Sequence, residues 1–292
     1  MSEGRSPERL CQAAACGRDL MAKPSSIGAL ILCAALLAAA PAAGSSPRIV
    51  GGGKANAAGW QFAVALTQRR RFICSGSLIA PTKVLTAAHC IKGGKRRQLS
   101  VLAGSPWITP HRRRPRIKVS AVAIDPAYNG HKDAHDFSVL TLASAPAAQP
   151  IVLATRAESK AATKPGRIVR SGGWGTRSAW GFNVARRLKA TRERIFRARV
   201  CDRLFGKERG FQEGTMICSL GKLVRRFHSR LPFHSTSCSG DSGGPVVAKT
   251  AGGPRLIGLV SAGPFPCGFG GPSIYARVAS RLGFIRRAAG LP

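Results

Sequence analysis

CSGDSGGP, residues 238–245, is the stretch of this sequence that points most directly to a fold and a chemistry. Glycines on both sides of Ser242 allow a tight backbone turn and the close approach of a substrate chain. Such a turn can also aim the amides of Gly240 and Ser242 at one point, where a developing oxyanion would need them. A serine is a weak nucleophile on its own, so this chemistry requires a base elsewhere in the chain.

We expect the base at His89, in LTAAHC (85–90), and its orienting partner at Asp136, in HDFSVL (135–140). Taken singly, each signal has a plainer explanation: a glycine-rich loop, a packed or surface histidine, and a turn residue before a strand. An aspartate at the head of an apolar strand is costly unless it is paired. The occurrence of all three in the order His, Asp, Ser favours a catalytic triad.

Short apolar runs separated by turn signals recur along the chain. They are FAVAL (62–66), SLIA (77–80), KVLTAA (83–88), QLSVLAG (98–104), RIKVSAVAI (116–124), FSVLTL (137–142), RIVRSGGWG (167–175), PVVAK (245–249) and RLIGLVSAG (255–263). Several alternate apolar and polar residues and are rich in Val and Ile, which is typical of an antiparallel all-β protein. The one helix predicted is the C-terminal ARVASRLGFIRRAAG (276–290), where apolar residues recur at helical spacing.

Residues 1–48 are expected to be a leader, a signal peptide and a short pro-segment. Residues 27–43 carry no charge and end in small residues that fit a signal-peptidase site. A retained membrane anchor is the alternative, but the run is shorter than the roughly 20 residues of a membrane span. Export predicts a secreted protein, either extracellular or periplasmic.

Six cysteines follow this preface, and their number and context favour three disulfides. They are Cys74, Cys90, Cys201, Cys218, Cys238 and Cys267. None lies in a C-x-x-C pair, which disfavours a zinc site, and an even set behind an export signal is typical of an oxidising compartment. The count alone leaves the pairing open.

The formal net charge is +34, from 46 Lys and Arg against 12 Asp and Glu. Such a surface should attract polyanions such as nucleic acid, anionic lipid or acidic cell-wall polymers. A genomic base bias toward Arg is the plainer explanation, although it does not account for the shortage of acids. The basic residues gather at 68–71, 92–97, 111–116 and 223–230.

From Ile49 to about Gly290 the chain resembles the chymotrypsin/trypsin family of serine endopeptidases. The resemblance rests on IVGG (49–52), Trp60-Gln61, CSGSLI (74–79), VLTAAHC (84–90), Asp136, GWG (173–175), CSGDSGGP, GLVSAG (258–263) and PSIYARV (272–278). It implies an all-β fold of two six-stranded antiparallel β-barrels, about 49–155 and 156–292, with the active site between them and a short C-terminal helix. It also implies the disulfides Cys74–Cys90, Cys201–Cys218 and Cys238–Cys267.

By the same resemblance, an activating protease cleaves after Arg48, and the freed amine of Ile49 pairs with Asp241. This pairing would form the oxyanion hole only in the mature enzyme, because a buried carboxylate beside the nucleophile requires a cation. No cofactor is expected. The basic residues of 111–116 stand where calcium-binding members carry carboxylates, so no metal is expected either.

The resemblance places Thr236 at the floor of the primary specificity pocket, with Ser261, Gly263 and Ser273 around it. Trypsin-like enzymes carry an aspartate at the floor, and a neutral Thr236 therefore predicts no preference for Arg or Lys. Small pocket residues favour medium apolar or aromatic side chains.

Three functions follow from these features. The first is a monomeric secreted endopeptidase that acts on proteins or peptides through His89, Asp136 and Ser242. The second is a cationic protein of the same fold whose main role is to bind anionic surfaces. The third is an inactive relative, disabled by Ala262 or by the insert at 219–237.

Overall fold

The computed structural model describes residues 52–108, 115–130, 134–181, 183–205, 210–226 and 232–292. The expected signal peptide, Arg48 and Ile49 therefore lie outside the described residues, as do most of 111–116 and part of 223–230. Within the described ranges, no helix is long and apolar enough to cross a membrane.

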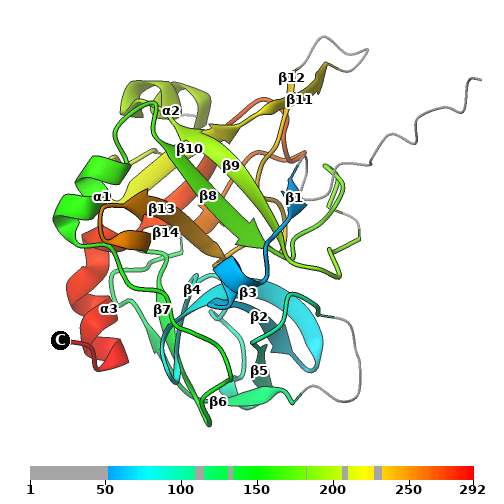
Figure 1. The fold of residues 1–292 in the computed structure, drawn as a ribbon, viewed down its shortest axis with the longest axis vertical. Coiled ribbons are helices and arrows are strands. Elements are labelled where there is room, and N and C mark those ends of the chain that lie inside the picture. The colour runs from blue at the N-terminus through cyan, green and yellow to red at the C-terminus, as the bar shows by residue number, and fades with distance from the viewer. Residues whose placement is uncertain (1–51, 109–114, 131–133, 182, 206–209, 227–231) are drawn as a thin grey trace, which may run out of the picture. The chain divides into compact units, whose positions relative to one another are not determined.

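Antiparallel strands form two closed barrels, which confirms the predicted fold (Figure 1). The first barrel contains β2 (Ala63–Gln68), β3 (Arg71–Ala80), β4 (Lys83–Thr86), β5 (Leu99–Leu102), β6 (Ile117–Ile124) and β7 (Ser138–Leu142). The second contains β8 (Ile168–Gly173), β9 (Lys189–Ile195), β10 (Met216–Gly221), β13 (Pro245–Thr250), β14 (Gly253–Ala262) and β15 (Ser273–Arg277). Pairing between β8 and β9 closes this second ring.

Three short strands lie outside the two rings. The strand β1 (Gly53–Lys54) pairs with β9 and so extends the sheet of the second barrel. The strands β11 (Leu223–Arg226) and β12 (Pro232–His234) form a separate two-stranded sheet.

Period-2 alternation decides which side chains each barrel buries. In β9 the residues Thr191, Glu193 and Ile195 are buried, while Arg192 and Arg194 between them are exposed. The apolar interior of the first barrel includes Leu66, Leu78, Leu85 and Leu140, and that of the second includes Val169, Val246, Ile257 and Tyr275. The alternation therefore turns the arginines of β9 outward, while its inward face carries Thr191 and Glu193 as well as Ile195.

Three α-helices are described, of which the sequence predicted one. They are α1 (Arg156–Ala162), α2 (Ala198–Phe205) and α3 (Leu282–Ala289), the last preceded by a 3-10 helix at Val278–Arg281. The predicted start of the C-terminal helix at residue 276 is wrong, because Ala276 and Arg277 pair with neighbouring strands as the end of β15.

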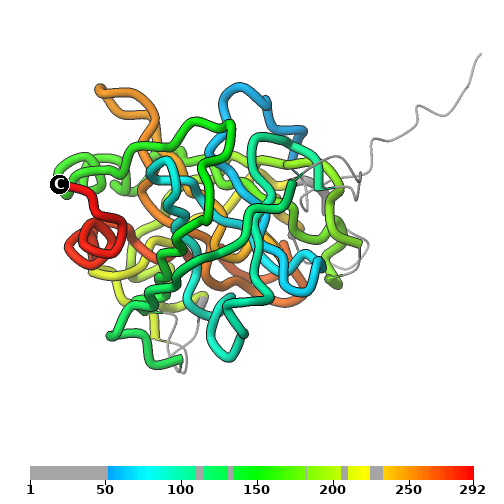
Figure 2. The backbone as a smooth tube through the Cα atoms, turned by 90° about the horizontal axis from the view of Figure 1, so that it is seen from below, coloured from blue at the N-terminus to red at the C-terminus, as the bar shows by residue number. Residues whose placement is uncertain are grey.

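The C-terminal helix packs against the first barrel. Leu282 and Ile285 join the same buried cluster as Leu140 of β7. Arg281 makes a two-bond ion pair with the buried Asp125, at 2.5 Å for each bond. Figure 2 shows this helix, in red, beside segments of the first barrel, in green. The C-terminal helix α3 therefore packs against the first barrel, although the two are far apart in the sequence.

Three disulfides join the pairs that the family resemblance implies. Cys74–Cys90 links β3 to the segment after β4, and Cys201–Cys218 links α2 to β10. Cys238–Cys267 links the loop before Ser242 to the loop after β14.

Candidate active site

Ser242 lies in a turn that requires glycine at the two positions Gly240 and Gly243. Gly240 and Gly243 on either side have φ values of +92° and +75°, in the left-handed region that other residues rarely adopt. A Cβ on Gly243 would lie 2.1 Å from Thr86 Oγ1, so the turn is pressed directly against the end of β4. The amide of Ser75 donates to the Ser242 carbonyl at 2.9 Å. The serine of the second barrel is therefore held at the surface of the first.

His89 and Asp136 come together because their strands pair. His89 follows β4 and Asp136 precedes β7, and Thr86 lies opposite Ser138 in the register of these antiparallel strands. His89 Nδ1 lies 2.7 Å from Asp136 Oδ2, and the His89 amide donates to Asp136 Oδ1 at 2.9 Å. The carboxylate is 1% exposed and the imidazole 34%. Ser261 Oγ also donates to Asp136 Oδ2, at 2.6 Å.

This contact fixes the imidazole in one orientation. With Asp136 accepting from Nδ1, the proton sits on Nδ1 and Nε2 is left as the basic nitrogen. Nε2 of a one-third exposed ring can take a proton from a hydroxyl, which is the chemistry of a general base.

Two amides of the Ser242 turn remain available as donors. The amides of Asp241, Gly243 and Gly244 donate to protein carbonyls, whereas those of Gly240 and Ser242 make no hydrogen bond to the described residues. Free amides at a tight turn are what an oxyanion would require.

Asp241 points away from the substrate side into the protein. It is 1% exposed and accepts from the amides of Gly175 (2.7 Å) and Cys238 (2.9 Å). Burial raises the pKa of Asp241 to about 7, although these two amides lower it in part. It makes no ion pair within the described ranges, so an ionised Asp241 would carry an uncompensated buried charge.

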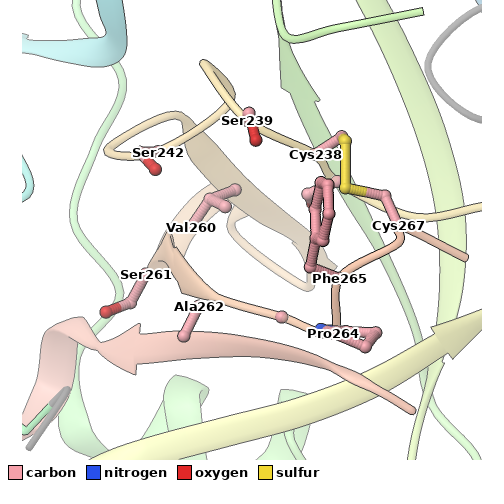
Figure 3. A pocket seen from close by; sticks show the side chains of 11 residues that line it. Cys238, Ser239, Ser242, Val260, Ser261, Ala262, Pro264, Phe265 and Cys267 are labelled. Atoms are coloured by element: carbon pink, nitrogen blue, oxygen red, sulfur yellow. A yellow bond between two sulfur atoms is a disulfide. The ribbon is translucent and has the colours of Figure 1, made fainter. Parts of the chain in front are cut away.

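A small cavity opens beside Ser242 (Figure 3). Its volume is about 150 Å³, which suits a single side chain rather than a whole ligand. Ser237, Ser261, Gly263 and the Cys238–Cys267 disulfide line it, together with Phe265. Phe265 lines the same cavity as that disulfide and adds an aromatic surface that the sequence did not predict (Figure 3).

Two of the predicted pocket residues do not line this cavity. Thr236 and Ser273 are each 1% exposed, and their hydroxyl oxygens lie 2.6 Å apart. They lie in the layer behind the lining, where Ser237, adjacent in sequence to Thr236, faces the cavity.

A second buried carboxylate, which no sequence motif indicates, lies close to these hydroxyls. Glu193, on β9, is 0% exposed, and it accepts hydrogen bonds from Ser171 Oγ (2.8 Å), Ser219 Oγ (2.6 Å) and the Tyr275 hydroxyl. Burial raises the pKa of Glu193, while Ser219, Tyr275, Ser171 and the nearby Ser273 act in the opposite direction. The run KATRERI has no motif, so only the fold reveals that Glu193 points inward.

Comparisons with known proteins agree with this architecture. The trypsin family model matches residues 49–285. A trypsin of Saccharopolyspora erythraea is 32% identical over 234 residues, which cover 80% of this chain and 94% of that protein. Kallikrein-7 of Homo sapiens is 30% identical over 221 residues, 75% of this chain and 78% of that protein.

A solved structure leads to the same class of protein. Neuropsin, a serine protease expressed in the limbic system of mouse brain, matches with a TM-score of 0.67 and 27% identity, covering 82% of this chain and 98% of that one. The double barrel and these relatives define a serine endopeptidase, a hydrolase of peptide bonds. The chain belongs to the trypsin family.

Proposed function

We propose that this protein is a monomeric, secreted serine endopeptidase that acts through Ser242, His89 and Asp136. The observation that carries the proposal is the 2.7 Å contact between His89 Nδ1 and Asp136 Oδ2, because it leaves Nε2 as the base. The turn that holds Ser242 against the first barrel provides the nucleophile. Protein or peptide substrates follow from the family.

The proposed reaction has two halves. Ser242 Oγ attacks the carbonyl carbon of the substrate while His89 Nε2 takes the hydroxyl proton. The C–N bond breaks as His89 returns that proton to the leaving amine, which leaves an acyl group on Ser242. Water then attacks the acyl carbon, His89 takes a proton from it, and Ser242 departs with that proton. The amides of Gly240 and Ser242 stabilise the oxyanion in both halves.

We also propose that the chain is made as a zymogen. After removal of the signal peptide, another protease would cleave after Arg48, and the amine of Ile49 would pair with Asp241. The support is the buried carboxylate of Asp241, which no cation compensates in the described ranges. Its backbone follows directly on Gly240, so pairing would fix the oxyanion-binding turn.

The test uses the full chain, secreted and then cleaved after Arg48. A fluorophosphonate probe should label it, and it should digest casein; both activities should be lost in Ser242→Ala. Ser280→Ala is the matched control, because Ser280 lies in the 3-10 helix Val278–Arg281, where its hydroxyl donates to the Arg277 carbonyl. Labelling that persists in Ser242→Ala, or a cleaved chain that neither labels nor digests casein, would refute the proposal.

A second function, binding to anionic polymers, is favoured by a basic groove on the outer face of the second barrel. Arg170 on β8 lies directly opposite Arg192 on β9, and both are exposed. Like charges opposite one another destabilise a sheet unless an anion lies between them. Arg167 and Lys249 line the same groove of about 670 Å³, and no acidic residue is among its described lining. These contacts support a polyanion-binding face separate from Ser242.

Heparin binding to the Ser242→Ala chain would measure this function without proteolysis. The triple variant Arg170→Ser, Arg192→Ser and Lys249→Ser should bind heparin more weakly. The slope of its log affinity against log salt concentration should also fall by up to about three, since each contact between a cation and an anionic group of the polymer releases a counterion.

The control removes the same charge from the first barrel, at Lys95, Arg96 and Arg97. An equal loss of heparin affinity in both triple variants would mean that diffuse charge, and not the groove, binds the polymer.

A further inference from the structure

Glu193 is a buried carboxylate that the proposed mechanism does not use. Its side chain has no contact with solvent, and it forms no ion pair in the described part of the chain. A carboxylate has about four lone-pair sites, and three hydroxyls donate to this one: Ser171, Ser219 and Tyr275. This donor set fits the ionised form of Glu193, whereas burial opposes that form by raising the pKa of the carboxyl.

One route joins Glu193 to the pocket through two hydroxyls. Ser237 lines the cavity, and its Oγ lies 3.3 Å from Ser171 Oγ. Ser171 has one proton, which it donates to Glu193 Oε1. Ser237 must therefore be the donor in its contact with Ser171, and its lone pairs are left for a donor in the cavity.

A second pair of hydroxyls lies behind the lining of the cavity. The oxygens of Thr236 and Ser273 lie 2.6 Å apart, and Ser273 acts against burial by lowering the pKa of Glu193. The hydroxyl that faces the cavity, Ser237, is therefore polarised toward accepting by a negative charge that lies behind Ser171.

We propose that Glu193 determines specificity by making the primary pocket select a cationic side chain, lysine or arginine. A buried carboxylate without a cation is costly, and a substrate ammonium or guanidinium in the cavity would compensate it. The inference rests on the proposed proteolytic function. The inferred preference for Lys or Arg replaces the preference for apolar side chains that the neutral Thr236 led us to expect, because Glu193 on β9 would supply the negative charge that Thr236 lacks.

The first experiment compares peptide substrates that differ only in Lys or Phe at the cleaved position. In Glu193→Gln the ratio of kcat/KM for Lys over Phe should fall at least about tenfold, equivalent to about 1.4 kcal/mol. Thr236→Asp, added to Glu193→Gln, returns a carboxylate to the layer behind the lining and should restore the ratio. Glu158→Gln is the charge-matched control, since Glu158 lies at the start of α1 and pairs with Arg255; its ratio should equal that of the unmodified chain.

An unmodified enzyme that prefers Phe, or a Glu193→Gln variant that loses both substrates equally without rescue by Thr236→Asp, would overturn the inference. Fluorophosphonate labelling, measured on the same preparations, keeps the two proposals separate. A chain that does not label contradicts the proteolytic function, whereas a chain that labels but shows no Lys preference contradicts only the role of Glu193.

A second measurement needs neither catalysis nor a Glu193 variant. Calorimetry on the cleaved Ser242→Ala chain would compare benzylamine with benzyl alcohol, two ligands of nearly equal size that differ in charge. Benzylamine should bind at least about tenfold more tightly. Equal affinities would overturn the inference.

Discussion

At the residue scale, Asp136 has three donors: the His89 amide, the His89 ring and the Ser261 hydroxyl. Asp136→Asn removes the charge and offers an amide in place of one acceptor oxygen, so His89 would present the wrong tautomer to Ser242. We expect kcat to fall by about 10⁴ with little change in folding. Single-turnover kinetics and thermal unfolding of the same variant would check this; a loss of less than tenfold in a folded variant would contradict it.

The pKa of Asp241 predicts a difference between the uncleaved and cleaved chains. Because this pKa is raised from 3.8 to about 7, the folded uncleaved chain keeps a proton that the unfolded chain releases. Its stability therefore falls as pH rises between these values, by up to about 1.4 kcal/mol per pH unit, and the full cost remains above pH 7. Pairing with the amine of Ile49 would remove this cost.

The cleaved Ser242→Ala chain should thus melt at a higher temperature than the uncleaved one, with a larger gap near pH 8 than near pH 5. Differential scanning calorimetry at both pH values would measure the gap. In Asp241→Asn the gap should become independent of pH. A gap that is equal at both pH values in the unmodified chain would speak against the pairing.

Individual residues differ in how far the sequence could predict them. Ser242 is flanked by glycines whose backbone demands are visible in CSGDSGGP, and His89 and Asp136 stand at the ends of recognisable apolar runs. Glu193 has no such signal, because its importance comes from hydroxyls on three other strands that only the closed barrel brings together.

At the element scale, the sequence predicted the strands with apolar runs and missed those that hold polar residues inside the barrel. The runs of β2 to β8, β13 and β14 are apolar enough to be recognised. By contrast, β9 buries Thr191 and Glu193 and exposes arginines, so its alternation is polar on both faces. The helix α2 was missed too; the disulfide of Cys201 ties it to β10, and the cysteine count left that pairing open.

The helix α1 carries a capping signal that the prediction overlooked. Thr155 Oγ1 accepts from the Glu158 amide at 3.1 Å, and Glu158 accepts from the Thr155 amide at 2.9 Å. Thr155→Ala should lower the free energy of unfolding by about 1 kcal/mol and leave kcat/KM unchanged, since the cap lies far from Ser242 in the fold. Urea denaturation would measure this, with Thr155→Ser as the control that keeps the hydroxyl. Equal stability of the Ala and Ser variants would contradict the role of the cap.

At the scale of the whole molecule, acidic and basic side chains differ in burial. Of the 12 acidic residues, Asp125, Asp136, Glu193 and Asp241 are buried, where they hold a helix or serve the candidate site. Of the Lys and Arg residues whose burial is described, Lys189 is buried and the others are exposed or half-buried, where few acidic residues remain to pair with them. The shortage of acids is therefore strongest outside, which makes the exterior more cationic than composition alone indicates.

This separation predicts opposite effects of salt on the free and the polyanion-bound protein. Repulsion among surface cations destabilises the free chain, and at about 0.5 M NaCl the Debye length falls to a few ångströms. The melting temperature of Ser242→Ala should then rise by at least about 2 °C over that at low salt, roughly 1 kcal/mol for a chain of this size. A heparin oligosaccharide should raise it at low salt, by binding the folded state, and lose this effect as salt releases the polymer. Calorimetric scans over a salt series, with and without heparin, would show the two curves converging. A melting temperature of the free chain that falls with salt would show that self-repulsion does not limit its stability.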